Sequence, residues 1–326
     1  QVQAVVIEND GLDEWSGDVR PPADPDALSK EEMLARIREA GIVGLGGAAF
    51  PTAIKLNPPE GKVIDTLIVN GAECEPYLTS DHRTMLECAD QIADGIGFAQ
   101  KILGAQRVVV GIEANKPDAI AAMRLACAGK GYEVAELMTK YPQGGEKQLI
   151  NVLAGRQVPS GKLPMDAGCV VVNVSTAAAI ADALRNGRPL VARTVTVTGA
   201  VNKPANLRVR IGEAIGNLIE QCGGAAEGAN KVILGGPMMG MSAYNLQTPV
   251  VKGTSGILLV ADDADPLSPL ANCIRCASCV GACPIHLMPL ELYQLSRREL
   301  FERAAKEHAM DCIECGLCTY ICPSRL

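Results

Sequence analysis

The chain has 326 residues, of which 48% are hydrophobic and only 3% aromatic, so its core must be built mainly from aliphatic side chains. Its length predicts two or three domains. Lys and Arg number 30 against 37 Asp and Glu, and the net charge of −7 disfavours nucleic acid as a partner. No apolar run approaches the roughly 18 residues that cross a bilayer, so we expect no transmembrane segment of its own.

Residues 1–27 are briefly apolar and then acidic and proline-rich. We interpret them as the end of a missing N-terminal domain followed by a linker. Ser29-Lys30-Glu31-Glu32 is a capping box that predicts the start of an amphipathic helix, which ends at Gly41. A glycine-rich loop over residues 41–52 follows this helix.

Short apolar runs then alternate with helical patterns. The predicted strands are 63–70, 107–112, 132–138 and 169–174, and the predicted helices are 81–103, 117–128, 146–154 and 176–186. Apolar strands separated by helices of this length predict a parallel sheet covered on both faces. We therefore assign an α/β domain to residues 28–188.

The pattern changes after Pro189. Period-two patterns at 194–199 and 207–211 predict strands, and a helix at 213–221 and a strand at 232–234 follow. These elements predict a small α+β domain over 189–262. The acidic stretch Asp262–Pro266 is the next linker, and residues 263–326 form a cysteine-rich tail with one helical stretch, Leu290–Glu307.

Eight of the 13 cysteines form two runs of identical spacing, C-x2-C-x2-C-x3-C-P, in this tail. The runs are Cys273, Cys276, Cys279 and Cys283, and Cys312, Cys315, Cys318 and Cys322. This is the bacterial ferredoxin spacing, in which three thiolates hold one [4Fe–4S] cluster and the fourth ligates the other cluster. We therefore expect Cys322 to join the first three cysteines of the first run, and Cys283 to join those of the second.

A pair of structural zinc sites is the alternative, although zinc knuckles usually use two C-x2-C pairs for one ion. Free thiolates indicate a reducing compartment. The remaining cysteines show no ligand spacing, and four of them are expected to be small buried hydrophobic residues. These four are Cys88, Cys127, Cys169 and Cys222. The role of Cys74 is left open.

The loop Gly44-Leu45-Gly46-Gly47-Ala48-Ala49 formally matches a dinucleotide fingerprint, but it follows a helix and not a strand. Stacked glycines still let backbone N–H groups approach a phosphate or an aromatic ring closely. A helix C-cap explains Gly41 but not Gly44, Gly46 and Gly47 together. We therefore expect this loop to hold a ligand.

Polar residues follow several of the predicted strands, where ligands gather in parallel sheets. Asn70-Gly71-Ala72-Glu73-Cys74-Glu75-Pro76 ends the first strand, and Asn173 ends the last. Gly144-Gly145-Glu146-Lys147 precedes a helix, a position that suits a ligand phosphate. Glu73 and Glu75 could equally be solvated loop acids.

Together these motifs resemble two related families. Gly44-x-Gly46-Gly47-x-x-Phe50-Pro51-Thr52-x-x-Lys55, Asn70-x-x-Glu73-x-Glu75-Pro76 and Gly145-Glu146 resemble, in this order, motifs of the NADH-binding subunit of respiratory complex I. The chain is more similar to the C subunits of the Rnf complexes, which are ion-translocating ferredoxin–NAD oxidoreductases. That family shares the motif Asn70–Tyr77, the small α+β domain and the doubled ferredoxin tail.

The resemblance implies a site residue by residue. Gly44, Gly46, Lys55, Asn70, Glu73, Gly145, Glu146 and Asn173 would hold FMN, and Gly47, Phe50, Glu75 and Lys162 would face NADH. This chain departs from the complex I motifs at several positions. It has Ala72 where the complex I subunit has an Asp, and Lys147 where that subunit has a second Glu. Pro58 and Met165 stand in place of the aromatic residues that flank the adenine. The domain at 189–262 would be a β-grasp domain of the soluble-ligand-binding type, which we interpret as structural, and 263–326 a helical domain with two [4Fe–4S] clusters.

The resemblance further implies an electron-input subunit that exchanges electrons between NAD(H), FMN and two [4Fe–4S] clusters towards ferredoxin. Its partners would be the other subunits of a membrane-bound complex, including a ferredoxin-like iron–sulfur subunit. It would lie peripherally on the cytoplasmic face of the bacterial inner membrane. Because hydride transfer to a flavin needs no protein acid or base, we expect no catalytic residue. The alternatives are a cobalamin reductase of a bacterial microcompartment and a flavin-free two-cluster relay.

Overall fold

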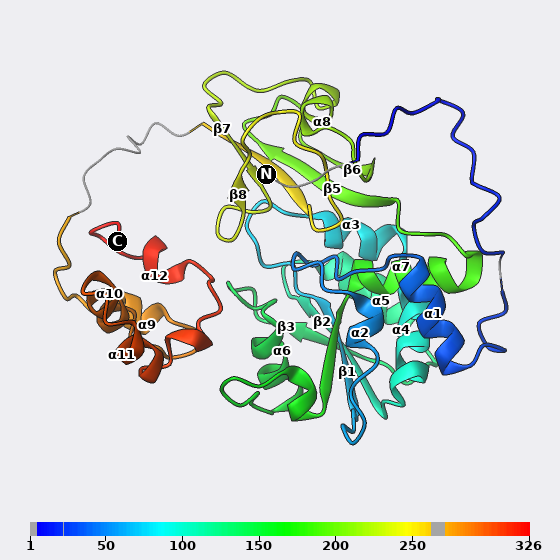
Figure 1. The fold of residues 1–326 in the computed structure, drawn as a ribbon, viewed down its shortest axis with the longest axis horizontal. Coiled ribbons are helices and arrows are strands. Elements are labelled where there is room, and N and C mark those ends of the chain that lie inside the picture. The colour runs from blue at the N-terminus through cyan, green and yellow to red at the C-terminus, as the bar shows by residue number, and fades with distance from the viewer. Residues whose placement is uncertain (1–4, 22, 262–270) are drawn as a thin grey trace.

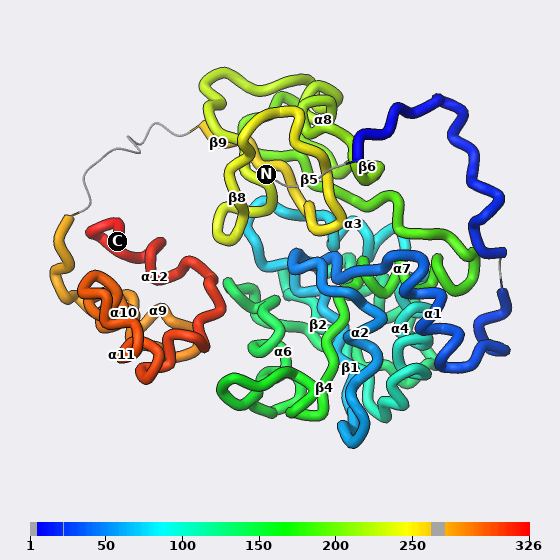
Figure 2. Tube along the Cα trace, in the orientation of Figure 1, coloured from blue at the N-terminus to red at the C-terminus, as the bar shows by residue number. Residues whose placement is uncertain are grey.

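The computed structural model describes residues 5–21, 23–261 and 271–326. Two sheet-containing parts pack on one another, and the cysteine-rich tail lies beside them (Figures 1 and 2). The linker predicted at Asp262–Pro266 lies outside the described residues. Within those residues, no helix combines the length and the apolar character that crossing a membrane requires.

The first sheet is parallel throughout, as predicted. Its strands are β1 (Thr66–Gly71), β2 (Arg107–Glu113), β3 (Glu133–Leu137) and β4 (Cys169–Asn173), and their spatial order is β3-β2-β1-β4. The chain proceeds outward from β1 to β2 and β3 and then returns to the other side of β1. The direction of winding therefore reverses between β1 and β4, which is where open parallel sheets bind their ligands.

Helices cover both faces of this sheet. Those on one face are α1 (Lys30–Glu39), α3 (Ser80–Glu87), α4 (Ala89–Leu103), α5 (Pro117–Ala126) and α7 (Val174–Asn186), and the other face carries α6 (Glu146–Ala154). Leu67 and Val69 of β1 face the first group, whereas Ile68 between them packs against α6. Strands β1, β2 and β4 are largely apolar on both faces because both faces are buried, whereas the edge strand β3 exposes Glu133 and Glu136.

The capping box at the start of α1 is confirmed. The Ser29 hydroxyl accepts the Glu32 amide at 3.2 Å, and the Glu32 carboxylate accepts the Ser29 amide at 2.8 Å. The short helix α2 (Thr52–Lys55) then follows the glycine-rich loop. The loop therefore does begin after a helix, as its sequence context indicated.

The single helix predicted over 81–103 is wrong. It is divided into α3 and α4 at Cys88, whose φ of −129° and ψ of 27° are not helical. The break lets α4 lie along α7, where Gly95 is so close to the Ala177 backbone that a Cβ atom would overlap it. The helical pattern of apolar residues continues through Cys88 without a glycine or proline, so the sequence did not indicate this turn.

The cysteines outside the two runs mostly lie in the interior. Cys127, Cys169 and Cys222 are buried, as predicted for small hydrophobic residues. Cys88 is only partly buried, because it occupies the turn between α3 and α4 and not a core position of a continuous helix. The prediction of full burial is therefore wrong for Cys88, and for the same reason as the prediction of the helix.

The second sheet is mixed and has the order β6-β5-β9-β7-β8. Its strands are β5 (Ala192–Gly199), β6 (Ala205–Arg210), β7 (Lys231–Leu234), β8 (Met241–Ser242) and β9 (Gly256–Val260), with α8 (Ile215–Gln221) packed in the same core. β5 and β9 are parallel, and the other neighbours are antiparallel. This arrangement agrees with the predicted α+β character.

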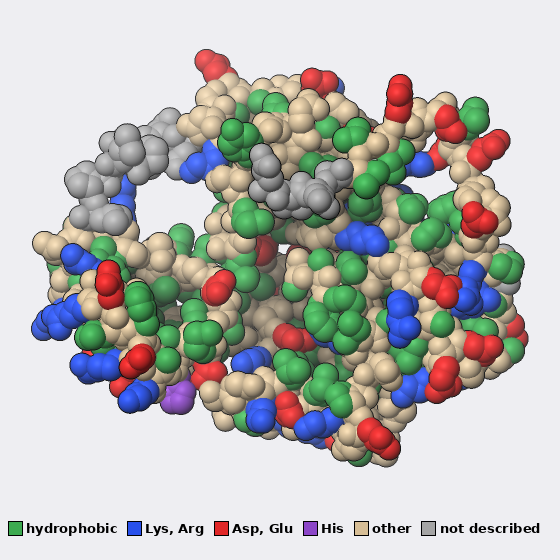
Figure 3. All heavy atoms as spheres, in the orientation of Figure 1, with side chains coloured by type: hydrophobic (Ala, Val, Ile, Leu, Met, Phe, Trp, Pro, Cys, Tyr) green, Lys and Arg blue, Asp and Glu red, His purple; other side chains and the backbone are tan. Residues whose placement is uncertain are grey.

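The tail is built from short helices around the two cysteine runs. They are α9 (Ser278–Ala282), α10 (Pro289–Arg297), α11 (Phe301–Lys306) and α12 (Leu317–Tyr320), and a 3-10 turn at Ala309–Asp311 precedes α12. Another 3-10 turn, at Pro164–Ala167, precedes β4 in the first sheet. The single helical stretch predicted over Leu290–Glu307 is wrong, because Glu299 has a φ of 57° and separates α10 from α11. Basic side chains gather along the outer edge of the tail in Figure 3.

Candidate functional site

The site lies where β1 and β4 end. Asn70 and Asn173 are direct partners in the register of these strands, at the switch point of the sheet. The side-chain Nδ2 of Asn70 donates to the carbonyl of Gly144 at 2.9 Å, and its Oδ1 accepts the backbone amide of Ala72 at 3.0 Å. Asn173 caps α7 by accepting the amides of Ser175 and Thr176. Two residues far apart in sequence are thereby brought together at one edge of the sheet.

The glycine loop packs over this edge. The Leu45 amide donates to the Thr176 hydroxyl at 2.8 Å, and a Cβ atom on Gly46 would lie 3.4 Å from the Asn173 side chain. Gly47 has a φ of +125°, which favours glycine, and open space lies where its side chain would be. The backbone of this loop is thus open to a ligand above the ends of β1 and β4.

Lys55 connects two of the predicted motifs. From the end of α2, its ammonium group donates to Oε1 of Glu146 at 2.5 Å and to the carbonyl of Val171 in β4 at 2.9 Å. Glu146 is the first residue of α6, and Gly145 before it caps that helix. The contact therefore ties the glycine-loop segment to the Gly-Glu motif on the opposite side of the switch point.

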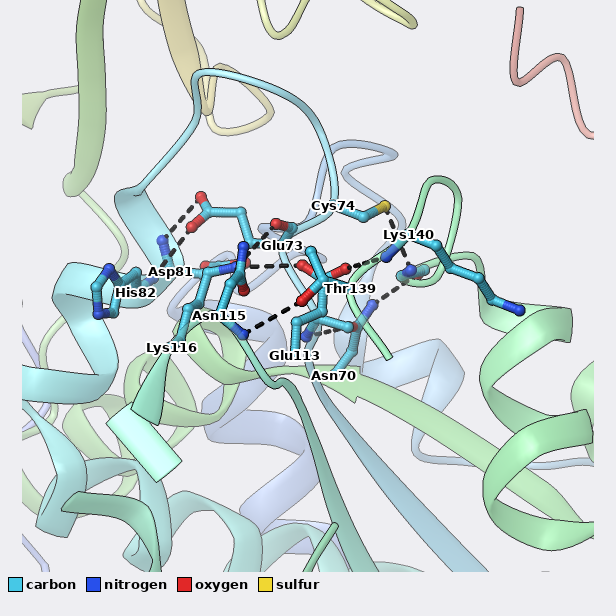
Figure 4. Close-up of polar contacts among 12 residues, drawn as sticks. Asn70, Glu73, Cys74, Asp81, His82, Glu113, Asn115, Lys116, Thr139 and Lys140 are labelled. Atoms are coloured by element: carbon cyan, nitrogen blue, oxygen red, sulfur yellow. Dashed lines mark hydrogen bonds and ion pairs between the residues drawn. The ribbon is translucent and has the colours of Figure 1, made fainter. Parts of the chain in front are cut away.

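Glu73 has a role that sequence reasoning missed. Its carboxylate accepts the Ser80 hydroxyl and the amides of Asp81 and His82 at 3.0–3.1 Å, so it caps α3 from a preceding loop (Figure 4). Asp81 is buried and accepts hydrogen bonds from Ser175 and Asn173. Burial, followed by the charge of Glu73, raises the pKa of the Asp81 carboxyl. Neither residue is a free solvated acid.

A buried ion pair supports the same loop from below. Lys116 contacts Glu113 at 3.2 Å and also donates to the carbonyl of Glu73 at 3.2 Å, and both charged side chains are almost fully buried (Figure 4). The Gly144 amide points at the thiol of Cys74 at 3.3 Å. Burial raises the pKa of Cys74 to about 11. This cysteine is therefore a neutral thiol that packs in the loop.

Arg193 is a second residue that sequence reasoning missed. It lies on β5 of the second sheet, yet its guanidinium group donates to the carbonyls of Leu45 in the glycine loop and of Lys252. Burial lowers the pKa of Arg193 to about 10, and the charges of Asp81 and Glu73 oppose this shift. In the sequence, Arg193 directly precedes the period-two pattern at 194–199, and such an alternation does not identify a buried cation.

A cleft of about 390 Å³ opens among these residues, a size typical of small-molecule sites, which range over about 300–1,000 Å³. Its wall includes seven of the predicted cofactor residues, namely Gly46, Asn70, Glu73, Glu75, Gly145, Glu146 and Asn173. Gln148 also lines it, and Oε1 of this side chain is buried without a hydrogen-bond partner among the described residues. An orphaned polar atom at an open cleft fits a polar ligand such as FMN.

Five predicted residues do not line this cleft. The Gly44 amide donates to the Phe50 carbonyl at 2.8 Å, a hydrogen bond that shapes the glycine loop, and Gly47 lies in the same loop. Lys55 reaches the cleft only indirectly, through its ion pair with Glu146. Lys162 is exposed in a turn after α6. A nucleotide contact from Lys162 stays a prediction.

Glu75 is half-buried in the wall of the cleft. Its carboxylate accepts the amides of Met238 and Met239, which belong to the loop between β7 and β8. Burial raises the pKa of Glu75 above its usual value, and the hydrogen bonds from these two amides oppose only part of that shift. The second sheet therefore reaches the candidate site at Glu75 as well as at Arg193.

The two cysteine runs have the same backbone conformation. Left-handed residues occupy corresponding positions in both, at Arg275 and Glu314, Ala277 and Gly316, and His286 and Arg325. The amide of Glu314 points at the Cys312 thiol and that of Leu287 at the Cys283 thiol, at 3.4 and 3.3 Å. Hydrogen bonds from amides to the sulfurs are among the features that set the reduction potential of an iron–sulfur cluster.

The two runs also approach each other, because α9, which contains Cys279, packs against α12, which contains Cys318. Burial, followed by the charges of Cys318, Cys283 and Cys312, raises the pKa of Cys315. Just after Cys322, the Ser324 hydroxyl donates to the carbonyl of Asn272 at 2.9 Å, beside the first run. No three Cys, His, Asp or Glu side chains of the described residues converge closely enough to hold a metal ion as they stand. The cluster ligands therefore stay a prediction.

The tail contacts the first part of the chain at the cleft. The Tyr141 hydroxyl donates to the carbonyl of Cys315 at 2.8 Å, and Cys315 itself lines the cleft. Ser160 donates to Asp311 at 2.6 Å further along the same edge. The second cysteine run is thus the part of the tail that faces the candidate flavin site.

A larger cavity, of about 560 Å³, lies elsewhere, between the segment around Trp15, helix α7 and strands β5 and β6. It contains none of the predicted site residues. We therefore place the candidate site at the smaller cleft, where the sequence motifs and the tail meet.

Comparisons with known proteins agree with this arrangement. Residues 37–182 match the Nuo51 FMN-binding domain, residues 194–242 the SLBB domain and residues 272–326 the 4Fe-4S dicluster domain. These matches confirm the predicted fold classes. A crystal structure of an NAD+-reducing [NiFe]-hydrogenase in the air-oxidized state shares the fold, with a TM-score of 0.61, 23% identity and coverage of 73% of this chain and 48% of that one.

Three curated relatives share much more sequence. The C subunit of the proton-translocating ferredoxin:NAD(+) oxidoreductase complex of Clostridium ljungdahlii is 50% identical over 94% of this chain and 67% of its own length. Its counterpart in the Na(+)-translocating complex of Acetobacterium woodii is 46% identical over 95% and 71%. The C subunit of the ion-translocating oxidoreductase complex of Rhodobacter capsulatus is 47% identical over 94% of this chain, which spans 59% of that relative.

Proposed function

Since the chain belongs to the family of C subunits of the ion-translocating ferredoxin:NAD(+) oxidoreductase complexes, the Rnf family, we propose that it exchanges electrons between NAD(H) and an iron–sulfur partner. FMN would bind in the cleft, and the tail would hold two [4Fe–4S] clusters. The observation that carries this proposal is the composition of the cleft wall, in which seven predicted cofactor residues meet Cys315 of the second cysteine run.

Each side of the cleft offers groups that suit part of the flavin nucleotide. The amide groups of Asn70 and Asn173 lie at the strand ends, where ring heteroatoms can be hydrogen-bonded. Gly145 caps the nine-residue helix α6, whose N-terminal amides suit a phosphate. Lys55 and Glu146 connect the two sides through their 2.5 Å contact. When bound, FMN supplies the conversion between hydride transfer and one-electron transfer.

The residues of the chain would bind and orient the reactants and would transfer no proton. Glu75 would accept hydrogen bonds from the nucleotide, and Phe50, which is 49% exposed, offers an aromatic face beside the glycine loop. Tyr141 would hold the second cysteine run at the cleft through its bond to the Cys315 carbonyl. Cysteine ligation across the two runs would keep the two clusters close to each other.

The other subunits of the complex, including a ferredoxin-like iron–sulfur subunit, would be the partners of this chain. It would sit peripherally on the cytoplasmic face of the bacterial inner membrane. The complex as a whole would set the direction of electron transfer, so this chain would serve either the oxidation of NADH or the reduction of NAD+. The match to an FMN-binding domain over 37–182 favours this function over a flavin-free relay.

Replacing Glu75 by alanine is expected to raise KM for NADH about tenfold, because one or two hydrogen bonds to the nucleotide are lost. Iron and FMN content should stay unchanged, since Glu75 would touch neither group. Steady-state reduction of ferricyanide by NADH measures both kinetic constants. Glu87→Ala is the matched control, because Glu87 pairs with Arg83 on the surface of α3. An unaltered KM in Glu75→Ala would remove Glu75 from the nucleotide site.

A further inference from the structure

The loop Gly235–Gly240, which joins β7 to β8, reaches out of the second sheet to the cleft. The amides of Met238 and Met239 donate to the two carboxylate oxygens of Glu75 at 3.2 and 2.8 Å. Met239 also lines the cleft, together with Ser255 from the segment before β9. A domain that sequence analysis interpreted as structural therefore supplies part of the wall of the candidate site.

The approach of this loop to Glu75 is close enough to require glycine. A Cβ atom on Gly236 would overlap the Glu75 carboxylate and lie 2.7 Å from its Cδ atom. The loop is also fixed on its own side, because Gly235 donates to the Gly256 carbonyl and Gly240 to the Gly236 carbonyl, at 2.8 and 2.9 Å. Its position relative to Glu75 is thus set by the second sheet.

Backbone amides are the main partners of this carboxylate. Within residues 5–21, 23–261 and 271–326, no Lys, Arg or His side chain forms an ion pair with Glu75. A carboxylate offers about four acceptor positions, and the two amides occupy one on each oxygen. The remaining positions are available at the cleft wall, where a hydroxyl or amide group of a nucleotide can donate to them.

The same loop touches the tail. Gly316, which follows Cys315, packs against the carbonyl of Met238, and a Cβ atom there would lie 3.1 Å from that oxygen. Gly316 has a φ of +76°, so its backbone also favours glycine. One short loop therefore contacts both the predicted nucleotide residue and the second cysteine run.

We propose that the loop Gly235–Gly240 is a positioning element of the nucleotide site. It holds the Glu75 carboxylate in the orientation that accepts hydrogen bonds from the nicotinamide nucleotide, and it closes the cleft between that nucleotide and the tail. This role rests on the proposed function, because it gives the second domain a share in NAD(H) binding.

Gly236→Ala tests the contact directly. The new methyl group must displace either Glu75 or the loop, and Gly236 is not in a left-handed conformation, so the substitution adds no backbone strain. We expect the dissociation constant for NAD+ to rise roughly fivefold, as measured by isothermal titration calorimetry on the chain loaded with FMN and iron. Met241→Ala is the control, because Met241 is 73% exposed in β8 and does not line the cleft.

The double variant Glu75→Ala/Gly236→Ala separates positioning from general damage. If the loop acts through Glu75, the double variant should bind NAD+ as Glu75→Ala does, because the alanine removes both the ligand contact and the carboxylate that the new methyl group would displace. Additive losses, or unchanged binding in Gly236→Ala, would overturn the role of the loop. If Gly236→Ala yields too little folded protein, Met239→Pro removes the shorter hydrogen bond and should give the same result. Absence of NAD+ binding by the loaded wild-type chain would instead defeat the proposed function itself.

Discussion

Replacing Cys283 by alanine is expected to abolish the same cluster signal as replacing Cys315, although the two cysteines belong to different runs. The reason is that the fourth cysteine of each run would ligate the cluster of the other run. Each variant should lose about half of the roughly eight irons expected for two cubanes. Anaerobic iron analysis and low-temperature EPR of the reduced protein measure both effects.

The complementary pair sharpens this test. Cys322→Ala should lose the signal that Cys273→Ala loses, as the contact from Ser324 to Asn272 indicates. Cys222→Ala is the matched control, because Cys222 is buried in the core of the second sheet. If Cys283→Ala lost the signal of its own run, ligation within each run would replace the crossed arrangement. Zinc in place of iron would refute the cluster assignment altogether.

Replacing Lys55 by alanine should weaken FMN binding roughly ten- to hundredfold. Lys55 bridges Glu146 and the carbonyl of Val171 across the switch point, and its loss removes the ion-pair partner of the Glu146 carboxylate. Hydrogen bonds to charged groups contribute about 1.5–3 kcal/mol, which corresponds to this range. Titration of the flavin-depleted protein with FMN, followed by the change in flavin fluorescence, gives the dissociation constant directly.

Lys62→Ala provides the comparison for Lys55. Its ammonium group pairs with Asp166 at 2.6 Å, outside the cleft, so FMN affinity should match that of the unmodified chain. Equal affinity in Lys55→Ala and Lys62→Ala would show that Lys55 has no share in the flavin site. The two variants remove the same charge, so a general electrostatic effect on FMN would lower both affinities together.

Much of the fold could be predicted because its signals are local. Four apolar runs separated by helical patterns indicated the parallel sheet, since strands buried on both faces carry continuous apolar sequence. The capping box at Ser29 and Glu32 marked the start of α1 correctly. Local signals failed where packing decided the backbone, as at Cys88 and Glu299, where helices stop without a glycine or proline.

The site was only partly predictable for a related reason. Asn70, Gly145 and Asn173 could be found because ligands collect at strand ends and helix N-termini. Arg193 could not be found, because it reaches the glycine loop from a strand of a different sheet. The same holds for the amides of Met238 and Met239, which meet Glu75 across a large separation in sequence.

Glu73 shows how one residue type can serve two purposes. As a pattern, an acid after a strand indicates either a ligand contact or a solvated side chain. In the structure it lines the cleft and caps α3 at the same time. The capping role depends on where the next helix begins, and α3 begins at Ser80, within reach of the Glu73 carboxylate.

The amino-acid sequence by itself determined the spacing of the tail cysteines and the order of the predicted cofactor motifs, because ligand spacing and loop composition are properties of short segments. Tertiary structure alone decided that the second cysteine run faces the cleft, through the Tyr141 contact with Cys315, and that the β7–β8 loop holds Glu75. Those contacts join segments that are distant along the chain, and they exist only because two sheets and the tail pack around one switch point.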